Sequence, residues 1–263
     1  MRNLSEFIIS DDNKPSLVFQ KILELENIDP RLSFKDIITA TQKEWLRPSD
    51  SERWHLLETK SEAEQEKFKK LFAKAGIINA IAPTGKKYDY VLFMGGDIHG
   101  MQERLDFLTQ LAKNGLDVKQ LVFITAERPL DADHELAQLK DKQLKTEYDL
   151  LQFQYEQSEL SSLLHTQPIY INTPNKVINS KIYRATTPDG FIEWLKINPK
   201  PGSSLVISSQ PLIGYQNAVA LSLLPTFKIE SVGPESSTSV TTPEYFDTLA
   251  RWLYQEGKLR KII

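Results

Sequence analysis

Short runs of apolar residues alternate with amphipathic stretches from residue 88 to the end of the chain, and this alternation limits the fold more than any other feature. Runs this short, without internal polar alternation, suit strands that are buried on both faces. The runs are residues 88–94, 121–124, 168–172, 205–207 and 227–232. Between them, apolar residues recur at helical spacing, as Leu105, Leu108 and Leu111 do. Strands that alternate with helices pair in parallel through right-handed crossovers. The sequence therefore predicts an α/β domain with a mostly parallel sheet.

The first third of the chain shows helical spacing only. Ser16 precedes an apolar segment with three- and four-residue steps and is its expected N-cap, and a second segment of helical spacing follows Ser33. The amphipathic stretch of residues 68–82 predicts a longer helix. We therefore expect two parts, a helical region of residues 1–85 and an α/β domain of residues 86–263.

Charge and composition narrow the classes of partner. The chain has 32 basic and 35 acidic residues and a formal net charge of -3. It lacks the basic excess with which nucleic-acid-binding proteins meet phosphates. It contains no cysteine, which excludes disulfides, thiol catalysis and cysteine-ligated metals. The sequence also shows neither a secretory signal nor an apolar stretch of membrane-spanning length. We expect a cytoplasmic protein that binds neither nucleic acid nor membrane.

Ligands of open parallel sheets bind beyond the carboxyl ends of the strands, where helix N-termini direct their unpaired N–H groups. Four segments follow predicted strands in this way: residues 95–100, 125–128, 172–175 and 208–211. The first, GGDIHG, carries the most chemistry. Gly95 and Gly96 let a ligand approach the backbone closely, and Asp97 and His99 place an acid/base pair beside them.

This segment has two interpretations. It is either an anion or ribose site, or a tight strand-to-helix turn in which Asp97 caps the helix. Its spacing matches neither the dinucleotide-binding fingerprint nor a Walker-type phosphate loop.

Other polar residues of these segments also have two interpretations. Arg104 can hold a phosphate or carboxylate through its planar fork, or it can pair with a nearby acid such as Asp106. Ser208 and Ser209 can bind an anion or cap the next helix. The acidic residues 131–135 are metal-like by type, but we interpret them as a solvated helix start.

The order of the segments resembles a bacterial domain of unknown function that the YdcF, SanA and ElyC proteins share. That pattern has a strand ending in two glycines, a helix of the form R-x-x-x-A/L-x-x-L-x-x-x-G, and a further strand. A Ser/Thr-Glu pair that opens a helix, a Thr-centred motif before another helix, and a strand ending in Thr/Ser-Ser follow. The matching positions are Gly95, Gly96, Arg104, Leu108, Leu111, Gly115, Thr125, Thr146, Glu147, Thr186, Thr187, Ser208 and Ser209.

The resemblance covers residues 87–257. It implies a Rossmann-like three-layer sandwich with a pocket for a nucleotide-like or phosphorylated ligand. The chain departs from the family after Ser209, because residues 210–216 contain neither the family's His nor its Arg.

These observations favour a small-molecule-binding protein, and a transferase or hydrolase if it is an enzyme. The expected acid/base residues are Asp97, His99 and Glu147. The expected ligand-binding residues are Gly95, Gly96, Arg104, Thr125, Glu127, Thr187, Ser208, Ser209 and Gln210. By fold analogy, the ligand or cofactor is S-adenosylmethionine or another nucleotide, and no metal is expected.

The alternative is a non-enzymatic interaction protein that has kept the fold with a degenerate site. The absence of the family's His and Arg favours this alternative. Its protein partner would bind through residues 1–85 or through a charged helix that we expect over residues 134–164.

Overall fold

The computed structural model describes residues 3–48, 51–139 and 143–263 and divides into two compact units. One, the helical unit, is formed by Met1–Ile81, Gln210–Ser222 and Glu235–Ile263. The other, the sheet unit, is formed by Ala82–Ser209 and Leu223–Pro234.

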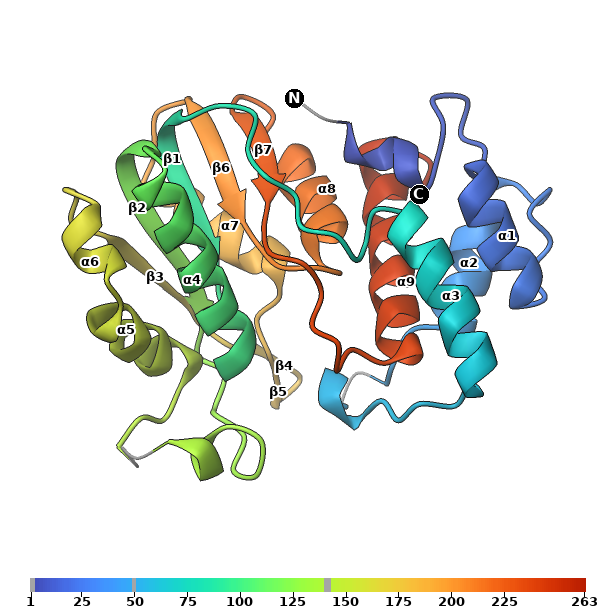
Figure 1. Cartoon of the computed structure of the whole chain (residues 1–263), viewed down its shortest axis with the longest axis horizontal. Helices are drawn as coiled ribbons and strands as arrows, with labels where there is room; N and C mark the ends of the chain where they lie inside the picture. The colour runs from blue at the N-terminus through green and yellow to red at the C-terminus, as the bar shows by residue number, and fades with distance from the viewer. Residues whose placement is uncertain (1–2, 49–50, 140–142) are drawn as a thin grey trace. The chain divides into compact units, whose positions relative to one another are not determined.

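The sheet unit is built on parallel strands in the order β3-β2-β1-β6-β7 (Figure 1). Their bounds are β1 Lys87–Met94, β2 Asp117–Ala126, β3 Ile169–Thr173, β6 Ser203–Ile207 and β7 Lys228–Val232. Every neighbouring pair runs parallel, which confirms the predicted α/β fold. The strand order reverses beside β1, since the chain proceeds outward to β2 and β3 and then returns to β6 on the other side. In open α/β sheets, ligands bind at the carboxyl ends of the strands beside such a reversal.

Helices cover both faces of this sheet, so the unit is a three-layer, Rossmann-like fold. On one face lie α4 (Ile98–Lys113), α5 (Glu147–Gln157) and α6 (Leu160–Leu163), and on the other lies α7 (Thr187–Leu195) (Figure 1). Phe123 contacts Phe93 and Tyr155 of α5 with ring centroids 5.2 and 5.0 Å away. Tyr90 points to the opposite face and meets Trp194 of α7 at 5.4 Å. These rings form the centre of the two hydrophobic layers.

Polar caps fix where the helices at the carboxyl edge begin. Asp97 accepts a hydrogen bond of 2.7 Å from the Gly100 N–H at the start of α4. Thr146 and Thr186 each form a capping box at the start of α5 and α7. The helix α4 ends at Asn114, before Gly115 with φ +86°.

A short antiparallel hairpin, β4 (Lys176–Ile178) and β5 (Lys181–Tyr183), leaves the carboxyl end of β3. Its two-residue turn has positive φ at both positions, as a type I′ turn requires. Val177 and Ile182 pair across the hairpin and are 71% and 70% exposed. The sequence analysis did not predict this hairpin, because Asn-Ser is a weaker turn signal than Asn-Gly and the strands are short.

Two predicted helices are wrong in extent. The charged helix expected over residues 134–164 is a 3-10 turn, Leu136–Gln138, followed by the separate helices α5 and α6. Residues 140–142 of that prediction lie outside the described part. Ser158 interrupts the expected helix with extended backbone. The helix expected over residues 68–82 is α3 (Glu62–Lys74), which ends before Gly76 because that glycine has φ +69°.

The helical unit consists of helices packed around an aromatic core. Its helices are α1 Leu17–Leu25, α2 Phe34–Glu44, α3, nearly all of α8 (Ile213–Leu223) and α9 Thr242–Leu259, with 3-10 turns at Leu4–Phe7 and Arg53–His55. Ser16 caps α1, as predicted, and Ser33 caps α2. Phe246 of α9 packs against Trp45 and Phe72, with ring centroids 4.8 and 5.5 Å away.

The C-terminal part of this unit differs from the predicted division at residue 85. Residues 210–222 and 235–263 belong with the N-terminal helices, because α9 packs on α2 and α3. Sequence order alone placed them with the sheet. Among the helices of the described residues, none has the length and apolar character that crossing a bilayer requires.

Candidate functional site

The carboxyl edge of the sheet unit brings most of the predicted site residues together. Gly95 and Gly96 follow β1, Thr125 and Glu127 lie at the end of β2, and Ser208 and Ser209 follow β6. Because the strands are parallel, all of these segments reach the same edge.

Arg104 has a structural role at this edge, because its side chain hydrogen-bonds to other parts of the chain. Its side chain is buried, with a relative exposure of 2%. Its guanidinium donates to the carbonyl oxygens of Met94 at 2.7 Å and Gly95 at 2.5 Å. It also donates twice to Ser209 Oγ, at 3.1 and 2.9 Å. Arg104 therefore ties the end of β1 to the end of β6.

Gly95 and Gly96 leave no room for a larger residue, because other side chains lie directly against them. A Cβ at Gly95 would overlap Glu147 Oε1. A Cβ at Gly96 would lie 3.0 Å from Arg104 Nη1. Gly95 also donates its N–H to the Ile124 carbonyl at 2.7 Å. The sequence predicted that a ligand would approach the backbone at Gly95 and Gly96. In the structure, the side chains of Glu147 and Arg104 make this close approach.

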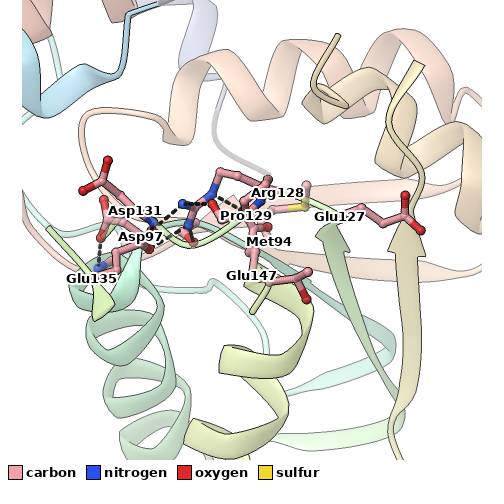
Figure 2. Close-up of polar contacts among 12 residues, drawn as sticks. Met94, Asp97, Glu127, Arg128, Pro129, Asp131, Glu135 and Glu147 are labelled. Atoms are coloured by element: carbon pink, nitrogen blue, oxygen red, sulfur yellow. Dashed lines mark hydrogen bonds and ion pairs between the residues drawn. The ribbon is translucent and has the colours of Figure 1, made fainter. Parts of the chain in front are cut away.

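Glu147, the first residue of α5, places a carboxylate beside Gly95. Its partner is Arg128, whose Nε donates to Glu147 Oε2 at 3.0 Å. Arg128 also binds both carboxylate oxygens of Glu135, at 2.5 and 2.8 Å, and donates to the Gly96 carbonyl at 2.9 Å. Figure 2 shows Arg128 between these groups, with Glu127 directed the other way. One guanidinium thus connects the glycine turn, α5 and the segment after β2.

Burial controls the electrostatics of this trio. Glu147, Arg128 and Glu135 are 5%, 3% and 0% exposed. Burial raises the pKa of Glu147, although the charges of Arg128 and Arg184 oppose that shift. Burial disfavours the charged form of Arg128, but its bonds to Glu135 and the nearby carboxylates outweigh this and raise its pKa. The predicted solvated helix start at residues 131–135 is therefore wrong for Glu135, which is a buried ion-pair partner.

Asp97 and His99, the predicted acid/base pair, lie in different environments. Asp97 accepts from the Gly100 N–H and caps α4, so the capping interpretation of this residue is confirmed. His99 is exposed on the first turn of α4 and meets His134 edge-to-face with ring centroids 6.0 Å apart. No group of three His, Cys, Asp or Glu side chains within the described ranges is arranged to hold a metal ion.

The remaining predicted ligand residues are placed along the same edge, with one exception. Thr125 is buried and donates to the Ile171 carbonyl at 3.1 Å. Thr187 is the half-buried first residue of α7. Ser208 is fully buried, and its N–H donates to Val232. Gln210 belongs to the helical unit, where its amide donates to the Gly76 and Asn79 carbonyls.

Glu127 is the exposed carboxylate at the end of β2. Its contacts are with Asn175, whose N–H donates to Glu127 Oε2 at 3.4 Å and whose amide donates to the Glu127 carbonyl at 3.1 Å. These bonds place the base of the β4–β5 hairpin beside the end of β2.

The sequence analysis did not identify three charged residues of this edge as members of one site. Arg128 follows Glu127 in a segment that it did select, but only the fold reveals the ion pairs. Glu135 looked like part of an acidic surface. Arg184, directly after β5, gave no sequence signal because the hairpin itself was not predicted.

The edge therefore combines a buried carboxylate of raised pKa, an exposed carboxylate and a rigid glycine turn on a Rossmann-like sheet. Carboxylates whose pKa values are shifted in this way occur both at functional sites and in structural ion-pair networks. Comparison of the chain with protein-family models, with curated proteins and with solved structures finds no match in any of the three.

Proposed function

We propose that this chain binds a small anionic or nucleotide-like ligand at the carboxyl edge of its parallel sheet, with Glu147 as the group that exchanges a proton with it. The single observation that carries the proposal is the Glu147 carboxylate. It is buried beside Gly95 at the end of β1, and burial raises its pKa. A perturbed carboxylate at a strand carboxyl end is the kind of group that general acid/base chemistry uses.

The nucleotide-like character of the ligand is supported by Glu127. It is an exposed carboxylate at the end of β2. In dinucleotide-binding α/β folds, an acidic residue beyond the first βα unit accepts hydrogen bonds from ribose hydroxyls. S-adenosylmethionine and adenine nucleotides carry such a diol, and this part of the proposal rests on fold analogy. The resemblance to the YdcF-like family, with its phosphorylated or nucleotide-like ligand, agrees with it.

A thermal-shift series tests the proposal. The purified protein is mixed with adenosine monophosphate, S-adenosylmethionine or glucose 6-phosphate, and its melting temperature is recorded. A ligand at about 100 times its dissociation constant adds about 2.7 kcal/mol of stability, which is about 5–11 °C for a protein of this size. The absence of a shift with all three compounds contradicts the proposal.

Two variants assign any shift to this edge. Glu147→Gln removes the ionisable group and should weaken or abolish binding. Gly85→Ala changes the turn at the opposite, amino-terminal end of β1, where a Cβ comes no closer than 3.4 Å to Tyr88, and it should bind like the wild type.

A second candidate is a non-enzymatic interaction protein. One observation favours it: the β4–β5 hairpin exposes Val177, Ile178, Ile182 and Tyr183 to solvent. Exposed apolar groups on a narrow ribbon suit contact with another protein. The double variant Val177→Asp/Ile182→Asp should abolish self-association or partner binding measured by sedimentation velocity and cross-linking, while the response to small ligands stays unchanged. If the wild type sediments as a monomer and cross-links to nothing, this second candidate is wrong.

A further inference from the structure

Two arginines of the helical unit share one buried carboxylate. Asp247 of α9 has a fully buried side chain and binds Arg47, from the segment after α2, and Arg251, one turn further along α9. Arg47 Nη1 and Arg251 Nε both lie against the same oxygen, Asp247 Oδ2, at 2.6 and 2.9 Å. The two guanidiniums are therefore neighbours, and their two positive charges meet one negative charge.

Both guanidiniums keep N–H donors that the fold does not use. Arg251 donates to Asp247 through Nε and Nη2, at 2.9 and 3.1 Å. Arg47 donates to Asp247 through Nη1 and to the Ser51 carbonyl through Nε, at 2.9 Å. Arg251 Nη1 and Arg47 Nη2 have no hydrogen-bond partner among the residues that the structure describes. Because the Arg47 and Arg251 side chains are 16% and 29% exposed, these donors are open to an ion from solution.

Arg53 brings a third positive charge to the same part of the helical unit. It opens the 3-10 turn Arg53–His55, two residues after the Ser51 carbonyl that Arg47 binds. Its side chain makes no hydrogen bond or ion pair in the described part of the chain, and its Nε is buried without a partner. A buried donor in this state costs stability, so packing alone gives no reason for an arginine here.

Positive charge exceeds negative charge in this cluster. Burial lowers the pKa of Arg47, and the like charges of Arg251 and Arg53 lower it further. The carboxylates of Asp247 and Glu52 oppose this shift without outweighing it. A bound anion would relieve the repulsion among the three guanidiniums.

We propose that Arg47, Arg53 and Arg251 together bind a phosphate group, either as inorganic phosphate or as the phosphate ester of a small molecule. Guanidinium groups present planar, paired donors that match the oxygens of phosphate. A phosphate ester carries about 1.5–2 negative charges at neutral pH, so it compensates the surplus of positive charge better than a carboxylate does. Asp247 holds two of the guanidiniums in place. The site belongs to the helical unit, and it is independent of the ligand site proposed for the sheet unit.

The test measures dissociation constants by calorimetry for inorganic phosphate, glucose 6-phosphate, glucose and acetate, at constant ionic strength set with sodium chloride. Inorganic phosphate and glucose 6-phosphate distinguish the two sources of the phosphate group, and acetate represents a carboxylate. The test variant is Arg53→Gln, which removes a charge without removing a hydrogen bond of the described residues. The matched control is Arg31→Gln, at an arginine of the same unit that is 87% exposed and paired with Asp29.

In the wild type, at least one of the two phosphate compounds should bind, and more tightly than acetate or glucose. Arg53→Gln should weaken that binding about tenfold to hundredfold, whereas Arg31→Gln should change it by less than about twofold. The free energy of unfolding of Arg53→Gln in urea should equal or exceed that of the wild type, because a repulsive charge is removed. Glu147→Gln, in the sheet unit, should leave this binding unchanged.

Four results would overturn the inference. They are the absence of binding by either phosphate compound, equal affinity for phosphate and acetate, unchanged phosphate binding in Arg53→Gln, and marked destabilisation of Arg53→Gln without phosphate. Phosphate binding that disappears in Glu147→Gln and persists in Arg53→Gln would support the proposed function and reject the arginine site. Phosphate binding that depends on Arg53 alone would support the arginine site whether or not the sheet unit binds a ligand.

Discussion

Replacing Arg104 with methionine tests whether this arginine is scaffold or ligand contact. Methionine has a similar length and no hydrogen-bond donor, so the cavity stays largely filled while the donors disappear. The carbonyls of Met94 and Gly95 and the hydroxyl of Ser209 then lose their donor. Each buried acceptor without a partner costs about 1–3 kcal/mol.

The expected loss follows from these contacts. Two carbonyls lose a charged donor, which amounts to about 2–6 kcal/mol. Release of a buried charge recovers part of this, so we expect a net loss of about 2–4 kcal/mol. For a protein of this size, the melting temperature should fall by about 4–16 °C.

Urea unfolding followed by circular dichroism measures this loss. The matched control is Gln102→Met, which introduces the same residue at an exposed position of the same helix, where only a bond to Asp106 is lost. It should change stability by less than about 0.5 kcal/mol. If Arg104→Met is as stable as Gln102→Met but fails to bind ligand, Arg104 is a ligand residue and the reasoning above is refuted.

Three further changes probe other parts of the molecule. Because burial raises the folded-state pKa of Glu147, its protonated form contributes stability below about pH 4.5, and this contribution is lost as the pH rises through the raised pKa. Urea unfolding between pH 4.5 and 8 should show the wild type losing up to about 1.4 kcal/mol per pH unit relative to Glu147→Gln within that window. If the stabilities of the wild type and Glu147→Gln change in parallel with pH, the raised pKa of Glu147 is contradicted. Gly190→Ala places a Cβ 2.5 Å from Ile124 Cγ2 and should cost about 1–3 kcal/mol, measured by thermal unfolding, whereas a neutral result would show that α7 can shift. Asp247→Asn leaves Arg47 and Arg251 without their buried carboxylate. It should lower the free energy of unfolding in urea by about 2–4 kcal/mol. An unchanged urea midpoint would show that these two ion pairs contribute nothing to stability.

The strand positions of the sheet unit and the start of α4 could be predicted because they depend on local signals. Buried strands need short apolar runs, and the side chain of Asp97 caps α4. The start of α5 at Thr146 did not follow from the spacing of residues, which predicted one charged helix over residues 134–164. The position rule for parallel sheets then selected the right edge for Gly95 and Glu127.

The roles of the charged residues could not be predicted, because they depend on tertiary contacts. Arg128 and Glu135 are seven positions apart and meet only because the chain between them folds back. Arg104 and Ser209 are 105 positions apart in the sequence. A single sequence does not show that Arg128 and Glu135 form an ion pair or that Arg104 donates to Ser209. Arg104, predicted as a ligand residue, is therefore seen as a structural residue only in the fold.

The division of the chain into units was likewise hidden from the sequence. Residues 235–263 carry a clear helical pattern, but nothing local states which helices they pack against. The contact of Asp247 with Arg47, 200 positions away, shows the partner.

That division has a consequence for how the protein is made. The helical unit uses both ends of the chain, and its Asp247 and Glu256 carboxylates satisfy Arg47 and Ser5 respectively. During synthesis, α2 and α3 therefore cannot complete their packing until α9 has left the ribosome. The sheet, whose last strand is Lys228–Val232, can finish pairing first. A nascent chain stalled after residue 234 should accordingly protect the strands against protease while α1, α2 and α3 remain open to cleavage.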